Sequence, residues 1–335
     1  MTKVTLIVPC YNEEGNIAPF YEAAVDTFED LEYELELIFV DDGSGDGTYK
    51  AINKLIPEQN MKIECVSFSR NFGKEAAIYA GLQRSQGDYT VIIDADMQQD
   101  PHLIPAMLDV IENDAECDSV VYYQASRRES KLLSLCKGAF YRLINHVSDV
   151  EFRTNASDFR LMNRRVVAAI LDMPEVDRFS KGIFEWVGFN KTYLPYTPAQ
   201  RLTGSSKWDF FSLMRYAFSG ITSFSTKPMK WAFAVGLMIT VAGAAVLAAT
   251  LVQASAAGGV IPRYMLIAGL VLFVGGLQLM FMGIYGYYSS NAFKEIKKRP
   301  MYIARDDHEI SRKNIVKIKT GKEQHTNDEF VYKVL

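Results

Sequence analysis

Val91-Ile92-Ile93-Asp94-Ala95-Asp96-Met97-Gln98 is the stretch of sequence that decides the fold of this chain. Its apolar half is typical of a buried β-strand, and the strand ends abruptly in two carboxylates spaced two residues apart. Side chains that follow a strand can turn toward a ligand, and paired carboxylates suit a hard divalent cation such as Mg²⁺ or Mn²⁺. A surface turn with solvated aspartates is the alternative interpretation, and the rest of the chain decides between the two.

Strand-like and helix-like segments alternate through the first 120 residues. This alternation predicts an α/β fold, with a mostly parallel sheet covered by helices on both faces. The predicted strands are 4–8, 35–40, 63–68, 89–93 and 119–122, and the predicted helices are 16–28, 46–56, 74–84 and 101–111.

Polar residues follow three of these predicted strands at the point where each strand ends. In open α/β sheets ligands bind beyond the carboxyl ends of the strands, so this repetition predicts a binding cleft. The residues are Tyr11, Asn12 and Glu13 after the first strand, Asp41 and Asp42 after the second, and Asp94 and Asp96 after the later one.

The overall composition excludes some classes of protein. The chain has 335 residues and a net charge of −4, so nothing indicates a nucleic-acid partner. Its cysteines are far apart in the sequence, which predicts reduced thiols in a cytosolic compartment. The apolar run at the N-terminus is too short for a signal peptide.

Two long apolar segments, 231–252 and 264–288, lie near the C-terminus, and Arg263 is the only charged residue between Lys230 and Lys294. A 22-residue helix would be about 33 Å long, enough to cross a bilayer core of about 30 Å. Lysines and arginines lie before the first apolar segment and after the second, which predicts that the chain on both outer sides of the two segments is in the cytoplasm. Burial in a protein core is the alternative interpretation for a single apolar run.

These segments divide the chain into predicted parts. Segments 131–147 and 205–230 mix apolar and basic residues, which favours helices lying at the membrane surface, with core packing as the alternative. The predicted parts are a cytoplasmic catalytic domain 1–204 that includes the interfacial helix 131–147, a juxtamembrane amphipathic segment 205–230, transmembrane helices 231–252 and 264–288, and a cytoplasmic tail 289–335. The end of that tail, from 306, carries no readable motif and is expected to be flexible or to dock on a neighbour.

Seven short sequence motifs occur along this chain in the same order as in a known protein family. The chain resembles the polyprenyl-phosphate glycosyltransferases of glycosyltransferase family 2, which include dolichol-phosphate mannose synthase and the bactoprenol glucosyltransferases and have the Rossmann-like GT-A fold. The motifs are Val8-Pro9-Cys10-Tyr11-Asn12-Glu13-Glu14, Val40-Asp41-Asp42-Gly43-Ser44, Arg70-Asn71-Phe72-Gly73-Lys74-Glu75, Asp94-Ala95-Asp96-Met97-Gln98, Asp158-Phe159-Arg160-Leu161, Arg201-Leu202-Thr203-Gly204-Ser205-Ser206-Lys207-Trp208 and Arg299-Pro300-Met301-Tyr302.

The resemblance implies a donor site for a nucleotide sugar. Asp96 is expected to bind Mg²⁺ or Mn²⁺ directly, and Asp94 to hold the ribose or the water shell of the metal. Asp42 would accept a hydrogen bond from the base and Glu13 one from the ribose, while Arg70 and Lys74 would meet phosphate unless Lys74 is an ordinary solvated residue. The expected donor-site residues are Pro9, Tyr11, Asn12, Glu13, Asp41, Asp42, Arg70, Lys74, Asp94, Ala95 and Gln98.

The resemblance also implies an acceptor site for a lipid phosphate. Asp158 matches the position proposed as catalytic base, and it could instead position the acceptor or pair with Arg160. A phosphate monoester is largely dianionic at neutral pH, so alignment and charge screening matter more than a base. The basic and polar candidates for holding it are Arg127, Lys131, Arg201, Ser205 and Lys207.

The implied activity is inverting transfer of a sugar to polyprenyl (undecaprenyl) phosphate on the cytoplasmic leaflet of the plasma membrane, for modification of cell-surface glycans. UDP-glucose is the expected donor, with UDP-GlcNAc and GDP-mannose as alternatives. The implied partners are the membrane, a second copy of the chain (relatives form tetramers), a flippase and a downstream glycosyltransferase. A non-catalytic membrane-anchored scaffold with a degenerate transferase fold is the alternative function.

Overall fold

The computed structural model describes residues 1–124, 156–173, 175–176, 178–197, 234–235, 238 and 263–310. The predicted interfacial helix 131–147, the juxtamembrane segment 205–230 and almost all of the first predicted span, 231–252, lie outside the described residues. The same holds for all five residues predicted to hold the acceptor phosphate, which are Arg127, Lys131, Arg201, Ser205 and Lys207.

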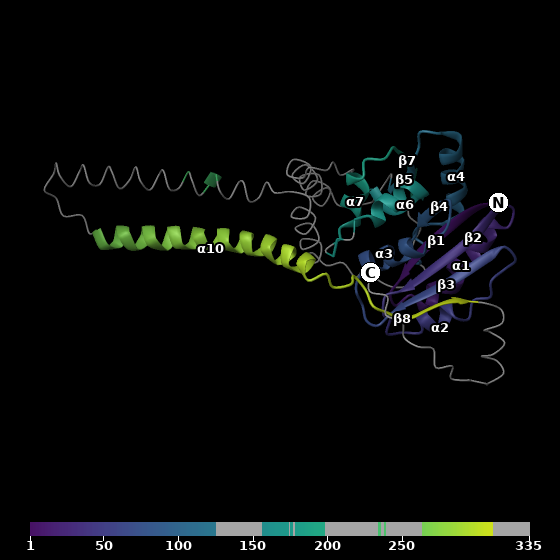
Figure 1. Cartoon of the computed structure of the whole chain (residues 1–335), viewed down its shortest axis with the longest axis horizontal. Coiled ribbons are helices and arrows are strands. Elements are labelled where there is room, and N and C mark those ends of the chain that lie inside the picture. The colour runs from purple at the N-terminus through teal and green to yellow at the C-terminus, as the bar shows by residue number, and fades with distance from the viewer. Residues whose placement is uncertain are drawn as a thin grey trace.

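A single mixed sheet of eight strands organises the part of the chain that the structure describes, in the order β7-β5-β6-β4-β1-β2-β3-β8 (Figure 1). Strands β4, β1, β2 and β3 are mutually parallel, whereas β6 runs antiparallel to both β4 and β5, and β8 runs antiparallel to β3. The strands are β1 (Thr2–Cys10), β2 (Tyr33–Asp41), β3 (Met61–Phe68), β4 (Tyr89–Ile92), β5 (Ser119–Gln124), β6 (Ala156–Asn163), β7 (Lys191–Tyr196) and β8 (Ala304–Ile310).

Helices cover both faces of this sheet, as the sequence predicts. Successive strand residues point to opposite faces, so Leu6 packs in a core with Phe20 of α1, whereas Ile7 packs in another core with Ile78 of α3. The described helices are α1 (Glu14–Phe28), α2 (Thr48–Ile52), α3 (Lys74–Arg84), the short 3-10 helix η1 (Pro101–Leu103), α4 (Ile104–Asn113), α6 (Arg164–Leu171), α7 (Ser180–Trp186) and α10 (Arg263–Ile296).

The predicted alternation is confirmed, with differences at element ends. The helix predicted at 46–56 is only α2, because the Asp46 side chain accepts hydrogen bonds from Thr48 and so ends the preceding loop just before the helix. The helix predicted at 101–111 begins as the 3-10 turn η1, in which the Asp100 side chain caps the His102 N–H. Strands β6, β7 and β8 were not predicted, and the antiparallel strands β6 and β8 make the sheet mixed.

The C-terminal tail corrects one prediction. The tail from 306 is expected to be flexible or to dock on a neighbour, but its first residues, 306–310, belong to β8 at the edge of the sheet beside β3. The Tyr302 ring stacks on Phe68 with 4.7 Å between centroids, the Tyr49 hydroxyl bonds Asp306, and Arg84 pairs with Asp307. The chain therefore returns from α10 to the domain in which it began; residues 311–335 lie outside the described residues.

Helix α10 occupies the second apolar segment and extends away from the sheet (Figure 1). Its C-terminal end contacts the loop after α6, where the Val176 N–H donates to Glu295 at 2.8 Å. Among the described residues, no helix combines the length and hydropathy of a membrane-crossing segment. The second predicted span, 264–288, lies within helix α10 and is therefore helical. Its place in a membrane stays a prediction.

Candidate functional site

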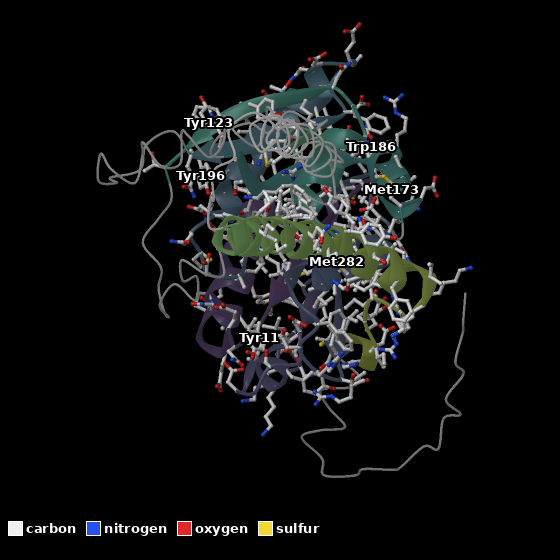
Figure 2. The ribbon with its side chains drawn as sticks, turned by 90° about the vertical axis from the view of Figure 1, so that its left-hand side faces the viewer. Tyr11, Tyr123, Met173, Trp186, Tyr196 and Met282 are labelled. Atoms are coloured by element: carbon white, nitrogen blue, oxygen red, sulfur yellow. The ribbon has the colours of Figure 1, made fainter. Side chains whose placement is uncertain are left out.

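The carboxyl ends of β4, β1 and β2 lie side by side, since these strands are parallel neighbours in the sheet. Their register pairs Ile7 with Ile92 and Cys10 with Asp41, so the residues that follow each strand emerge at the same edge. The prediction that the polar residues after these strands gather at one edge is therefore confirmed. Tyr11, which directly follows β1 and is labelled in Figure 2, is 38% exposed.

Hydrogen bonds between the loops after β1 and β2 hold the first part of this edge together. The Asn12 N–H donates to Ser44 Oγ at 2.9 Å, and the Gly45 N–H donates back to Asn12 Oδ1 at 2.8 Å. Asn12 has a φ of +55°, a left-handed conformation that Asn tolerates better than most residues. Glu13 donates its N–H to Thr48 Oγ1 at 2.8 Å and accepts from the Asn16 side chain at 2.6 Å. The predicted donor-site residues Asn12 and Glu13 thus build the loop itself.

The side chain of Asp41, another predicted donor-site residue, does not reach the surface. It is 0% exposed and accepts hydrogen bonds from Ser67 Oγ at 2.8 Å and from the Ser44 N–H at 3.0 Å. Ala95, also predicted to contact the donor, is 2% exposed and packs in the main core. Both side chains therefore lie beneath the edge, and a contact of either residue with the donor stays a prediction.

Asp42 joins the loop after β2 to the start of α3. Its carboxylate accepts from the N–H groups of Phe72 at 2.6 Å and Gly73 at 2.9 Å. Burial raises the pKa of Asp42 to about 6, although these two N–H groups act to lower it. Gly43 beside it has a φ of +63°, and a Cβ there would lie 2.4 Å from the backbone of Arg70. Only glycine therefore allows the close approach that brings Asp42 to α3.

The second part of the edge is an ionic cluster of Lys74, Asp94 and Asp158. Lys74 Nζ lies 2.7 Å from Asp94 Oδ1 and 3.0 Å from Asp158 Oδ2. Burial acts to raise the pKa of Asp158, but the positive charges of Lys74, Lys181 and Arg160 hold it well below its ordinary value. Burial acts to lower the pKa of Lys74, but Asp158 and Asp94 raise it above its ordinary value. Lys74 and Asp158 are therefore both ionised at neutral pH.

Gln99 is a residue of this cluster that the sequence reasoning missed. Its side-chain oxygen accepts from the Asp94 N–H at 3.0 Å, and its amide group lies 3.3 Å from Asp94 Oδ2 and 3.2 Å from Ser157 Oγ. Met97 has a φ of +59°, and this reversal turns Gln99 back beneath Asp94. The predicted neighbour Gln98 instead donates its backbone N–H to Asp96 Oδ1 at 3.1 Å. The adjacent glutamines could have indicated from sequence that an amide side chain contacts Asp94. Only the left-handed turn at Met97 shows that this side chain belongs to Gln99.

Asp158 and Arg160 do not form the pair that the sequence left open. Asp158 pairs with Lys74, while the Arg160 guanidinium lies 3.7 Å from the centre of the Phe184 ring and donates to the Ser157 carbonyl at 3.1 Å. Arg160 is only 2% exposed. Its role is to pack β6 against α7, which leaves Asp158 facing α3.

The donor set fits a hard divalent cation. Asp94 and Asp96 follow one strand and offer carboxylate oxygens, the ligands that Mg²⁺ and Mn²⁺ share with substrate phosphates. Within the described ranges, no three His, Cys, Asp or Glu side chains converge on a metal site, so phosphate and water would have to complete the shell. His102 is engaged elsewhere: its ring lies 2.6 Å from Asp100 and 2.9 Å from Asp26, whose hydrogen bonds raise its pKa.

Predictions for the remaining residues are partly answered. Arg70 is exposed and its guanidinium lies 4.7 Å from the centre of the Phe72 ring, so it remains accessible to a ligand. Pro9, at the end of β1, is half-buried. Cys10, Cys65 and Cys117 are free and buried, as expected for reduced thiols.

A mixed α/β sheet with acidic residues at the carboxyl ends of its parallel strands defines a Rossmann-like fold, and in such folds that edge is the usual place for a ligand. The sequence profile described as Glycosyl transferase family 2 matches residues 5–171. The prophage bactoprenol glucosyl transferase homolog of Escherichia coli (strain K12) is 37% identical over 308 residues, covering 90% of this chain and 98% of its own. The bactoprenol glucosyl transferase of Shigella phage SfII is 36% identical over 309 residues, covering 91% of this chain and 98% of its own.

An uncharacterized glycosyltransferase of Synechocystis, sll0501, is 35% identical over 91% of this chain and 95% of its own. Among solved structures, the mannosyltransferase PcManGT from Pyrobaculum calidifontis in complex with GDP-Man and Mn²⁺ aligns with a TM-score of 0.43 and 18% identity, over 89% of this chain and 88% of that chain. That likeness is too weak to support an argument. The family model and the nearly full-length relatives show that the chain belongs to glycosyltransferase family 2 and is a glycosyltransferase.

Proposed function

We propose that this protein transfers a sugar, with inversion, from a nucleotide-sugar donor to polyprenyl (undecaprenyl) phosphate, and that UDP-glucose is the donor. The observation that carries the proposal is the charged cluster at the end of β4, where Asp94 and Asp158 meet Lys74 within a chain of family 2. Nearly full-length relatives named bactoprenol glucosyl transferase support a lipid acceptor and a glucosyl donor.

Asp96 and Asp94 would hold a divalent cation, Mg²⁺ or Mn²⁺, against the donor diphosphate. When bound, such a cation neutralises the charge that develops on the leaving diphosphate. Asp96 is the proposed direct ligand, while Asp94, whose N–H and carboxylate both contact the Gln99 side chain, would bind the ribose or the metal's water shell. Tyr11, Glu13 and the edge near Asp42 would receive the nucleoside.

Asp158 would position the acceptor phosphate without taking a proton from it. The second pKa of a phosphate monoester is about 6, so the acceptor is mostly dianionic and nucleophilic at neutral pH. A carboxylate whose pKa is held well below its ordinary value is a weak base. Of the two roles that the sequence left open for Asp158, these facts favour positioning.

The proposal places the active site on the cytoplasmic face of the plasma membrane. Its support is the pair of apolar segments 231–252 and 264–288 with their basic flanks, together with the chemistry of a lipid acceptor whose head group lies at the interface. A homo-oligomer, a flippase and a downstream glycosyltransferase as partners remain predictions from the sequence.

Transfer of radiolabelled sugar tests the proposal. The full chain in detergent would be given polyprenyl phosphate with UDP-glucose, UDP-GlcNAc or GDP-mannose, each with Mg²⁺, with Mn²⁺ or with EDTA. A labelled lipid that forms with UDP-glucose and disappears with EDTA is expected, and Asp30→Asn, at an exposed carboxylate outside the site, should match the wild type. No labelled lipid from any donor with folded protein would overturn the proposal in favour of a non-catalytic scaffold.

A further inference from the structure

Lys74 occupies a position that a lysine normally avoids. It is the first residue of α3, where the helix dipole repels a positive charge. Gly73 before it has a φ of +99°, and the N–H groups of Phe72 and Gly73 are already satisfied by Asp42. The backbone at this point is therefore fixed without the help of the lysine side chain. Something else must favour a cation at this end of the helix.

Two carboxylates from neighbouring strands supply that favourable interaction. Asp94 follows β4 and Asp158 lies in β6, and these strands pair in antiparallel fashion with Ile92 opposite Arg160. Lys74 Nζ lies 2.7 Å from Asp94 Oδ1, 2.9 Å from Asp94 Oδ2 and 3.0 Å from Asp158 Oδ2. The ammonium group thus stands between two like charges that would otherwise repel each other.

The next residue of α3 secures the same helix end from the opposite side. Glu75 accepts hydrogen bonds from the N–H of Ser180 at 2.9 Å and from its hydroxyl, which join α3 to the start of α7. With Asp42 on one side and Ser180 on the other, the start of α3 cannot shift easily. Lys74 therefore projects from a fixed point, as a group that sets the positions of other side chains must do.

We propose that Lys74 is a positioning residue that bridges Asp94 and Asp158, and so fixes the distance between the donor-binding carboxylate and the acceptor-side carboxylate. This proposal rests on the proposed function for the meaning of the two carboxylates. It differs from the expectation that Lys74 binds the donor phosphate, because both of its close partners are carboxylates of the protein.

A stability cycle tests the bridge without any need for activity. We would measure the unfolding midpoint of the full chain, Lys74→Met, Asp158→Asn and the double variant, with the exposed Lys54→Met as the control. Lys74→Met should lower the midpoint by about 2–4 °C, the scale on which a domain of this size responds to one lost interaction. Adding Asp158→Asn should then raise the midpoint, because it removes one of two repelling charges, whereas alone it should lower it. An effect of Asp158→Asn with the same sign and size in both backgrounds would overturn the bridge.

Kinetics then test whether the bridge serves the reaction. Lys74→Met should lower kcat by about 10²-fold, while Lys74→Arg, which keeps the charge and several donors, should stay within about tenfold of the wild type. A raised KM for the donor with unchanged kcat would show a phosphate ligand and overturn the positioning role. If the wild-type chain transfers no sugar from any donor, the proposed function fails, and the stability cycle still decides the bridge on its own.

Discussion

Two halves of the same sheet edge are built in different ways. The loops after β1 and β2 are joined by backbone N–H groups and hydroxyls, as in the pairs Asn12–Ser44 and Glu13–Thr48. The cluster after β4 is joined by charges, with Lys74 between Asp94 and Asp158. Hydrogen bonds within a loop fix its shape before any ligand binds. A cluster of charged side chains also determines how strongly the charge that develops during the reaction is stabilised. We therefore expect changes in the first half to affect stability and donor affinity, and changes in the second to affect turnover.

The largest expected effect belongs to the charged half. Asp96→Ala removes the proposed direct metal ligand, and kcat should fall by about 10²- to 10³-fold, the loss typical of removing one electrostatic stabiliser. Thermal stabilisation by UDP with Mn²⁺ should disappear as well. Sugar transfer and a thermal-shift titration measure the two effects. Metal-dependent stabilisation that survives in this variant would show that the metal assignment is wrong.

The next effect belongs to the hydrogen-bonded half and concerns stability. Asp41→Asn replaces one acceptor of a fully buried carboxylate by an NH₂ group that faces the Ser44 N–H or the Ser67 hydroxyl. Leaving a buried donor unpaired costs about 1–3 kcal/mol, so the free energy of unfolding should fall by that amount. Chemical denaturation measures it. A large loss of kcat in protein that is still fully folded would contradict the purely structural role of Asp41.

Gln99 tests the boundary between the halves, since it uses neutral hydrogen bonds to hold a charged group. Gln99→Ala removes the acceptor of the Asp94 N–H and one donor to its carboxylate, and kcat should fall by about tenfold, equivalent to one net hydrogen bond. Gln98→Ala is the matched control, because Gln98 contacts Asp96 in this cluster through its backbone N–H. Equal losses of kcat in Gln99→Ala and Gln98→Ala would show that Gln99 has no special role in holding Asp94.

The smallest effect is the pH dependence of donor affinity. The pKa of Asp42 is raised to about 6, so its carboxylate gains a proton as the pH falls through that value and loses an acceptor for the donor base. The KM for the donor should rise a few-fold from pH 7 to pH 5.5. Because this pKa is higher in the folded than in the unfolded chain, Asp42 also makes stability fall as the pH rises from about 4 to 6, and the fall ends above that range.

Asp42→Asn should abolish this pH dependence of KM while leaving any dependence of kcat. An unchanged profile in the variant would mean that another group titrates. Steady-state kinetics between pH 5.5 and 8 separate the two quantities.

The sequence could predict much of this sheet edge because the signals are local. The strand before Asp94, the Asp-Asp-Gly-Ser turn after β2 and the register of helix α3 depend on residues close to one another in the chain. Gln99 could not be chosen over Gln98, since that choice depends on the left-handed turn at Met97. Asp41 and Asp42 looked alike in sequence, and only the pleat of β2 sends one inward to Ser67 and the other to α3.

What the sequence alone determined is the alternation of strands and helices, the sheet edge at which the polar residues gather and the family to which the chain belongs. What only the tertiary structure decided is how distant segments meet there. Antiparallel pairing of β6 with β4 brings Asp158 within reach of Lys74, and β8 returns the chain from α10 to β3. Pairing between strands far apart in the chain depends on backbone hydrogen bonds and packing that local patterns do not encode, and for this reason β6, with its buried Arg160, gave no clear strand signal.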